Sequence, residues 1–436
     1  MSVILNYSII AVIIFLSLIF PRWILLIGIV SILMILSYSN LLPTVLSIGD
    51  IDIWLFDIIM IIVMLRSLIA LRFHNHLLKI HPVYIALTGF LVIMAISSIL
   101  AYYHFGAKIG IKEFIALLRF SVQVVSLPLI ALIVTIEGKI ESCQKLLSYI
   151  GYSAALLIYM NIFLLPYGFS FGEVQVTEGS ARYFGLFGDQ VGFILLFFFL
   201  WELLKKRWLA AIVFGGAIIA TGTRGALITT AVGIGILFWK ALNVPSLGKR
   251  LWTGVIVSLV ILGALIVQDL GGTRSRFTGA TLESGIEQRW KMISLAIRVI
   301  LDHPLTGVGY MGFRHVADEY GARDVFGHWY APNFIATAPN QYLQVATDGG
   351  IIGLISFLWL IFVLLRELKI AGKNDRFFAA AYIWLLSLLI GNQTAAWLLP
   401  GSFISYMLWL IMGLLIGIQS RSWRHQYKRP TMSYRS

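Results

Sequence analysis

Two arginines stand in places where a positive charge is costly unless it binds something. The first is Arg224, in the turn 221–225 (TGTRG) between two apolar segments. An arginine at membrane depth costs about 3 kcal/mol or more unless it is paired or solvated. Such a side chain can also extend to the membrane surface, which is the structural alternative. The short, glycine-flanked turn leaves the guanidinium little room to do so, and the pattern therefore favours a functional cation.

The second arginine is Arg289, on a segment whose pattern predicts an amphipathic helix over residues 285–301. Its apolar residues recur at helical spacing, and they are Ile286, Trp290, Ile293, Ile297 and Ile300. Its polar stripe consists of Glu287, Lys291, Ser294 and Arg298. At ~100° per residue, Arg289 falls on the far flank of the apolar face, where a merely solvated charge would be misplaced. Arg289 is therefore the second candidate, whereas Lys291 and Arg298 fit a solvated face.

A glycine-rich segment, residues 303–313 (HPLTGVGYMGF), follows this predicted helix. Its letters include GxGxxG, but no strand pattern precedes it and no βαβ unit surrounds it, so we reject a dinucleotide site. Gly307 and Gly309 instead predict a compact turn in which two stretches of backbone approach closely.

Polar residues also mark the start of the next predicted span. Asn340 and Tyr342 lie in residues 339–344 (PNQYLQ), and Asp348 follows one or two turns inside, where a carboxylate needs a partner. His328, in the preceding loop, could act as a base, although a lone histidine there is more often a polar surface residue. No pair of histidines has metal-ligand spacing in a suitable context, so we expect no metal and no other cofactor.

The composition that surrounds these residues is that of a membrane protein. The chain has 436 residues, of which 59% are hydrophobic and 12% charged. A soluble domain carries about twice that charged fraction, and apolar stretches of about 15 to 25 residues suit a ~30 Å hydrocarbon core. We predict an all-α polytopic membrane protein with helices at 4–20, 23–38, 53–71, 83–103, 113–136, 146–166, 188–204, 207–223, 225–242, 251–268, 343–365, 377–397 and 402–419.

The net charge of +13 sets the expected orientation in the membrane. Counting spans backward from the C-terminus places every short basic loop on one side, and the positive-inside rule makes that side cytoplasmic. These basic segments are 72–79, 139–145, 205–207, 240–250, 366–376 and 421–435. The sequence therefore predicts residues 1–268 with the first ten helices, an extracytoplasmic loop at 269–342, the last three helices at 343–419 and a basic cytoplasmic tail at 420–436. Nothing in the sequence is typical of a nucleic-acid partner.

The loop at 269–342 is too long and too aromatic to be a simple connection. A loop of roughly 70 residues is usually functional or disordered, and its aromatic content argues against disorder. It also carries several positive charges on the translocated side, Arg274, Arg276, Arg289, Lys291, Arg298, Arg314 and Arg323. We expect a folded cap with a cationic interior that binds an anionic ligand. Arg182, in residues 181–190 (ARYFGLFGDQ), is expected where another span begins on the same side.

Together these segments resemble the O-antigen ligase and Wzy-type polymerase family of bacterial surface-glycan assembly. The resemblance covers nearly the whole chain in helix layout. It is sharpest from Arg289-Trp290 through residues 303–309 (HPLTGVG) and 340–343 (NQYL) to 350–354 (GIIGL), and the turn at Arg224 and the segment from Arg182 to Gly185 also match.

The resemblance implies a metal-independent glycosyltransferase of the bacterial inner membrane, with a polyprenyl-diphosphate-linked oligosaccharide as donor. Arg224 and Arg289 would hold the diphosphate through their planar guanidinium forks. They would also stabilise the charge that develops as the glycosyl bond breaks, and Asn340 would complete the catalytic set. The implied substrate-binding residues are Arg182, Arg298, Gly307, Gly309, Arg314, His328, Tyr342 and Asp348. Membrane lipid and a polysaccharide chain-length regulator are the implied partners.

One departure from the family pattern separates the alternatives. Ligases of the family have a histidine, assigned as the base, immediately before the asparagine, and Pro339 stands there in this chain. Either another group acts as base (Glu319, Asp324, His328 or Asp348), or the diphosphate leaving group makes a base less necessary. The sequence thus favours a polymerase over a ligase. A transporter of lipid-linked sugars, the third alternative, would be expected to show repeated halves, and we find no internal repeat.

Overall fold

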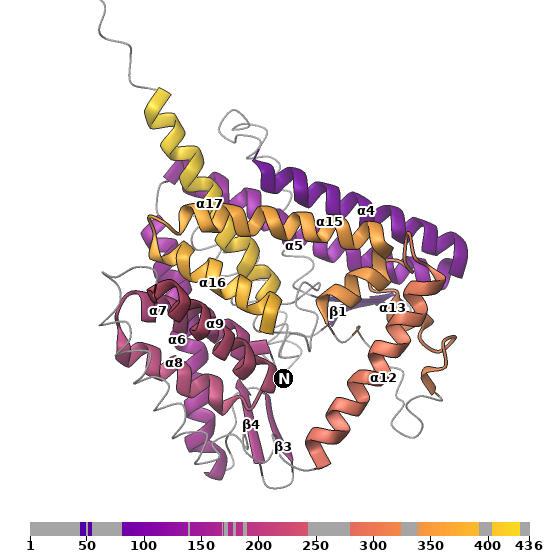
Figure 1. Ribbon diagram of the computed structural model, residues 1–436, viewed down its shortest axis with the longest axis horizontal. Helices are drawn as coiled ribbons and strands as arrows, with labels where there is room; N and C mark the ends of the chain where they lie inside the picture. The colour runs from indigo at the N-terminus through magenta and orange to yellow at the C-terminus, as the bar shows by residue number, and fades with distance from the viewer. Residues whose placement is uncertain are drawn as a thin grey trace, which may run out of the picture.

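The computed structural model describes residues 44–48, 51–54, 81–137, 140–167, 169, 173–177, 180–185, 190–242, 280–323, 338, 340–391 and 403–427. Helices account for most of these residues, and they form two packed groups with one separate helix at the side (Figure 1). The two groups are described first, because they position the candidate site.

The first group contains four long helices, α4 (Pro82–Phe105), α5 (Ala107–Glu137), α15 (Gln341–Ala371) and α17 (Phe403–Tyr427). α4 packs along both α5 and α15, and α17 packs along α5 (Figure 1). An aromatic cluster joins all four helices, since the Phe90 ring lies 6.4 Å from Phe120 and 6.1 Å from Phe357, and Phe120 lies 6.2 Å from Trp409. Such rings contribute both a large buried area and favourable edge-to-face contacts.

The second group surrounds α7 (Val191–Leu204), whose residues from Val191 to Leu203 are all buried. Around it pack α6 (Ile140–Leu164, extended by the 3₁₀ turn η2, Leu165–Tyr167), α8 (Trp208–Ala220), α9 (Arg224–Leu242) and α16 (Arg376–Gly391). The apolar sequence of α7 has no polar face, as expected of a helix enclosed by other helices. The indole of Trp384 on α16 donates a hydrogen bond to the Phe193 carbonyl, 2.8 Å away, and ties α16 to α7.

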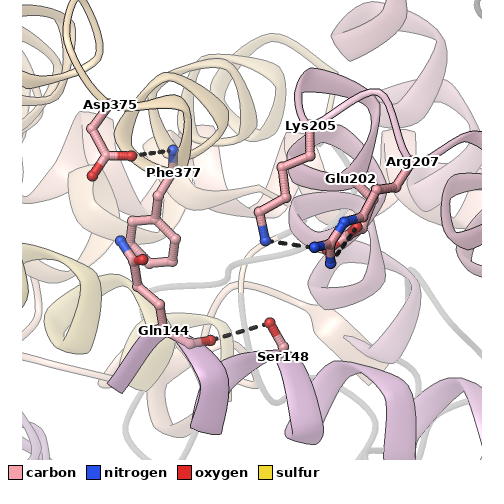
Figure 2. Close-up of polar contacts among 7 residues, drawn as sticks. All are labelled: Gln144, Ser148, Glu202, Lys205, Arg207, Asp375 and Phe377. Carbon is pink, nitrogen blue, oxygen red and sulfur yellow. Dashed lines mark hydrogen bonds and ion pairs between the residues drawn. The ribbon is translucent and has the colours of Figure 1, made fainter. Parts of the chain in front are cut away.

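Polar side chains from several helix connections gather at one end of these groups, which we call the basic end. Glu202 is 1% exposed and accepts a hydrogen bond from Lys205 Nζ at 3.5 Å, while Arg207 lies 3.9 Å away (Figure 2). Asp375 lies close enough for its charge to act on Lys205, and it also caps α16 by accepting from Phe377 N at 2.8 Å.

The first turns of α6 lie at this end too, near the connection between α15 and α16 (Figure 2). The beginning of α4 meets the last turns of α15 and α17 in the same way. His81 Nε2, at the N-cap of α4, lies 2.7 Å from Gln419 Oε1 on α17 and 3.6 Å from Glu367 Oε2 on α15. The segments 139–145, 205–207 and 366–376, which the charge pattern assigns to one side of the membrane, therefore lie at one end of the structure. The opposite end, where α4 ends and α9 and α15 begin, is called the loop end below.

Three of the described helical segments are long and apolar enough to cross a membrane: α4, Ile140–Tyr167 and α15. α7, α8, α9, α16 and α17 contribute shorter apolar helices. The prediction of an all-α polytopic membrane protein is confirmed. The number of spans stays a prediction, because the helices expected at 4–20, 23–38 and 251–268 lie outside the described residues, as does most of 53–71.

Two short antiparallel hairpins were not predicted: β1 (Thr44–Ile48) with β2 (Ile51–Trp54), and β3 (Glu173–Thr177) with β4 (Ser180–Gly185). Strand β2 replaces the beginning of the helix expected at 53–71. Arg182 lies within β4, paired with Gln175, and the span that it was expected to precede, predicted at 188–204, begins at Val191 as α7. The alternating valines of residues 173–177 (EVQVT) are a strand signal that could have shown this hairpin.

The two ends allow a direct test of orientation. We expect a cysteine at Asn374 to react with a membrane-impermeant maleimide only after permeabilisation, and a cysteine at Glu319 to react in intact cells, because the basic end should be cytoplasmic. Both residues are exposed. The background is Cys143→Ala, which removes the one cysteine of the chain. Labelling of both positions from the same side would contradict the orientation.

Candidate functional site

The separate helix of Figure 1 is α12 (Ala280–Asp302), which belongs to the loop between α9 and α15. Its second half packs with the segment after it, with the short helix α13 (Phe313–Val316) and with the beginning of α15. These form a small apolar core of their own, made of Leu295, Ala296, Val299, Val308, Phe313, Val316, Ala317, Ala322 and Ala338. The expected folded, partly helical loop is confirmed.

In the part of this loop that the structure describes, the interior is not cationic, contrary to our expectation. Arg289, Arg298, Arg314 and Arg323 are all exposed, and the core contains only apolar side chains. The physical reason is desolvation, because a guanidinium in an apolar core would lose its water without gaining a partner. These four arginines therefore lie on the surface, where an anion can reach them.

The buried face of α12 also differs from the predicted one. Trp290 and Ile297, assigned to the apolar face, are exposed, whereas Leu295, Ala296 and Val299 are buried. The helix has two apolar sides, and the sequence pattern could not tell which of them the protein covers. The polar stripe is as expected: Lys291 Nζ pairs with Glu287 Oε1 at 2.8 Å.

The glycine-rich segment after α12 docks onto a break in α15. At Gly350 the backbone leaves the helical conformation, with φ +61° and ψ −160°. Val308 N donates to the Thr347 carbonyl and Gly309 N to the Asp348 carbonyl, both at 2.9 Å, while Ile351 N donates to the Pro304 carbonyl at 2.8 Å. The segment thus supplies the hydrogen bonds that the interrupted helix lacks.

This contact is possible only because glycine stands on both sides of it. A Cβ atom on Gly307 would lie 2.4 Å from the Thr347 carbonyl oxygen, and one on Gly350 would lie 2.3 Å from the carbonyl carbon of Leu305. Both residues also have positive φ, +66° and +61°, which other residues rarely adopt. The close backbone approach expected for this segment is observed, with the break in α15 as its partner.

Two serines of α4, which the sequence reasoning missed, hold the same contact from the other side. Ser97 Oγ donates to the carbonyl oxygens of Thr306 and Asp348. Ser98 Oγ accepts from Tyr310 N at 3.0 Å. Adjacent serines within an apolar span were the available signal, since polar groups at membrane depth need partners.

Asp348 has the partners that its depth requires. It is 1% exposed, its Oδ1 accepts from Gln344 Nε2 at 2.8 Å, and its carboxyl group also accepts a hydrogen bond from the Met311 backbone. Gln344 continues the network, since its Oε1 accepts from Ala338 N at 2.6 Å. The carboxyl is therefore enclosed by the contact between the loop and α15.

The beginning of α15 brings Asn340 and Tyr342 to the loop end. Asn340 is the N-cap, and its Oδ1 accepts from Leu343 N at 2.9 Å, which satisfies a free N–H group of the first turn. The Tyr342 hydroxyl donates to the Leu389 carbonyl at 3.0 Å, near the end of α16. α16 in turn packs against α9 five residues after Arg224, where Gly391 contacts Thr229. The beginnings of α9 and α15 thus flank the end of α16.

Arg224 and Arg289 come from different elements and lie within electrostatic range of each other. Arg224 is the first residue of α9, after the predicted tight turn, in which Gly222 has φ +59°. Partial desolvation by the surrounding chain and the positive charge of Arg224 lower the pKa of Arg289, although a guanidinium stays charged at any physiological pH. Among the described residues, no ion pair involves Arg289. Two cations thus lie within range of each other's charge, one of them at a helix N-terminus, and such an arrangement attracts an anion.

The other predicted residues lie around this pair or outside the described part of the chain. Arg298 is exposed on α12, and Arg314 on α13 donates from Nε to His315 Nε2 at 3.1 Å. Arg182 is described only by its backbone in β4, and His328 lies outside the described residues. Within the described ranges, no group of three His, Cys, Asp or Glu side chains could hold a metal ion.

These features define a polytopic membrane protein with a folded loop at one end and a pair of arginines beside it. Residues 208–358 match the family model described as O-antigen ligase. The match runs from α8 to the middle of α15 and includes Arg224, Arg289, the glycine-rich segment and Asp348, so the resemblance stated above is confirmed over these residues. It supports a membrane enzyme of polysaccharide metabolism. A comparison with curated proteins found no match.

The glycine contact can be tested by adding one methyl group. We expect Gly307→Ala to lower the midpoint of thermal unfolding in detergent, because the new Cβ would meet backbone atoms and positive φ costs alanine about 1–2 kcal/mol. Overpacking adds a similar cost, ~1–3 kcal/mol. The matched control is Gly235→Ala, where nothing lies within 4 Å of the added Cβ in α9. Equal unfolding midpoints for the two variants would show that the contact is not tight.

Proposed function

We propose that this protein is a polymerase of a bacterial surface polysaccharide, an O-antigen or an exopolysaccharide. It transfers the growing glycan from a polyprenyl diphosphate to a sugar hydroxyl of another lipid-linked repeat unit, on the extracytoplasmic side of the inner membrane. The observation that carries the proposal is the proximity of Arg224 and Arg289 at the loop end.

Two guanidinium groups suit the chemistry of a diphosphate donor. Each can form paired hydrogen bonds with phosphate oxygens, and both cations lie where negative charge increases in the transition state. The acceptor hydroxyl oxygen attacks the anomeric carbon, the bond from that carbon to the diphosphate oxygen breaks, and the electron pair leaves with the polyprenyl diphosphate. The hydroxyl proton passes to a base or to water. No redox partner is needed.

The hydrogen bonds of four predicted residues support roles other than direct contact with the substrate. Gly307 N donates to the His303 carbonyl at 3.0 Å, and Gly309, Tyr342 and Asp348 are likewise bonded within the protein. In this proposal they shape the loop end. Asp348 is enclosed, which argues against it as the base and leaves Glu319, which is exposed, together with Asp324 and His328.

Arg182, Arg298 and Arg314 are assigned to the glycan by resemblance. Asn340 is proposed as the third member of the catalytic set because its N-cap position holds it at the loop end. A chain-length regulator is the protein partner that the polymerase assignment implies.

A ligase, which joins the glycan to lipid A–core, is the second candidate, and the description of the matched family favours it. Pro339 argues against it, because proline cannot accept a proton where ligases of the family have their histidine. Both candidates use the same donor, so the arginine pair serves either.

The role of the arginine pair can be tested by removing either the positive charge of each residue or the paired hydrogen bonds that its guanidinium can form. We expect Arg224→Ala and Arg289→Ala each to lower polymer formation by about 10²–10³-fold, the loss typical of removing one preorganised donor to a developing anion. Lysine at either position keeps the charge but loses the bidentate geometry, so an intermediate rate is expected. The measurement is the yield of high-molecular-weight glycan in cells that contain equal amounts of inserted protein.

The matched control is Lys291→Ala, which removes a cation two residues from Arg289 that already pairs with Glu287. It should leave the yield unchanged. Normal polymer in both alanine variants would refute the assignment of the pair, and an equal loss in the control would show that the effect comes from the general charge of α12.

The acceptor can be identified in a deletion strain. Because a polymerase acts before a ligase, we expect loss of this protein to leave single repeat units on the carrier lipid and on lipid A–core. Profiling of carrier-linked glycans measures this. Long glycans that accumulate on the carrier would instead identify a ligase.

A further inference from the structure

One side of α12 presents apolar side chains that the described protein does not cover. Trp290 is 65% exposed, Ile297 44% and Leu301 71%. These residues are seven and four positions apart, so they lie along one side of the helix. This exposed stripe (Trp290, Ile297, Leu301) is nearly opposite the buried residues Leu295, Ala296 and Val299.

The exposed stripe continues onto the outer surface of a predicted membrane span. Leu305, one turn beyond Leu301 along the chain, is 61% exposed, and it follows Pro304, whose carbonyl accepts from Ile351 N on α15. Ile351, Ile352 and Ile355 are exposed apolar residues of that span, of the kind that faces lipid. Exposed apolar residues therefore occur on α15, at Leu305 and along α12.

Aromatic residues place this surface at the edge of the membrane. Tyr102 and Tyr103 are exposed in the last turn of α4, and tyrosines gather where hydrocarbon meets the headgroups. The next residue, His104, has its ring 5.5 Å from that of His303, one residue after α12 ends. The C-terminal end of α12 is thus level with the aromatic end of a span. From there α12 runs steeply away from the direction of α4 and α15 instead of joining their bundle (Figure 1).

The charges of α12 lie on both flanks of the exposed stripe. At ~100° per residue, Arg289 lies about 100° from the stripe on one side, and Arg298 lies about 80° from it on the other. A helix at a lipid surface has this pattern, with an apolar side among the acyl chains and basic side chains level with the phosphates. Arginine side chains reach such phosphates readily.

We infer that α12 is an interfacial helix, with the exposed stripe inserted among the lipid chains of the outer leaflet and Arg289 held at the level of the phosphate groups. The occupant of the stripe is bilayer phospholipid. A consequence, which rests on the proposed function, is that a lipid-linked diphosphate meets Arg289 while its polyprenyl chain stays in the membrane. The depth of α12 itself does not depend on that function.

The test is spin labelling in vesicles of phosphatidylethanolamine and phosphatidylglycerol. In the Cys143→Ala background, a nitroxide is attached to cysteine at Ile297 or Leu301 in the stripe, or at Lys291 as the matched control on the polar side. Relaxation by oxygen reports lipid and relaxation by a water-soluble nickel chelate reports water. We expect strong oxygen and weak nickel relaxation at Ile297 and Leu301, and the reverse at Lys291.

Two outcomes would overturn the inference. If the stripe positions respond to nickel as strongly as Lys291, the helix lies in water; if they are shielded from both reagents, another protein surface covers the stripe. Size-exclusion chromatography of each labelled variant confirms that it is folded. Failure of the arginine variants to affect polymer would remove the proposed function and leave this result unchanged, so the two can fail separately.

Discussion

The backbone contact between residues 304–309 and the break in α15 at Gly350 governs the geometry of the loop end. A membrane span that is interrupted leaves N–H and C=O groups unpaired, and lipid cannot satisfy them. Here the carbonyls of Thr347 and Asp348 and the N–H of Ile351 are all bonded to the loop segment. Because this close contact requires glycine at both 307 and 350, these two residues fix the register in which the loop docks, and the serines of α4 reinforce that register.

That register determines where α12 lies, since the helix ends one residue before His303. Arg289 is 13 residues before the end of α12 at Asp302, or about 20 Å along the axis at ~1.5 Å per residue. A small rotation at the contact would therefore displace the guanidinium by several ångströms. Arg224 is fixed independently, by a tight turn inside the packed helices. The relative position of Arg224 and Arg289 thus depends on two separate elements. The glycine contact that determines this position lies far from either guanidinium.

The distribution of polar groups gives the two ends of the protein different roles. At the basic end, Glu202 is paired with lysine and arginine, and the interactions are internal (Figure 2). At the loop end, the acidic residue Asp348 is enclosed by hydrogen bonds, whereas Arg289 and Arg298 remain on the surface. Arg289 and Arg298 are thus exposed at the loop end, which is the end that the charge pattern assigns to the outside.

The sequence alone determined the class of the protein, the approximate helices, the arginine candidates and the close approach at Gly307, because hydrophobic length, charge placement and glycine chemistry are local properties. It also showed the family resemblance, which the family model matches over residues 208–358. It missed the hairpin that contains Arg182, the serines of α4 and the buried side of α12. Only the tertiary structure decided these features. The sequence of a helix with two apolar sides does not tell which side is covered by protein. A hydrogen bond between distant segments also produces no recognisable pattern in the sequence of either segment.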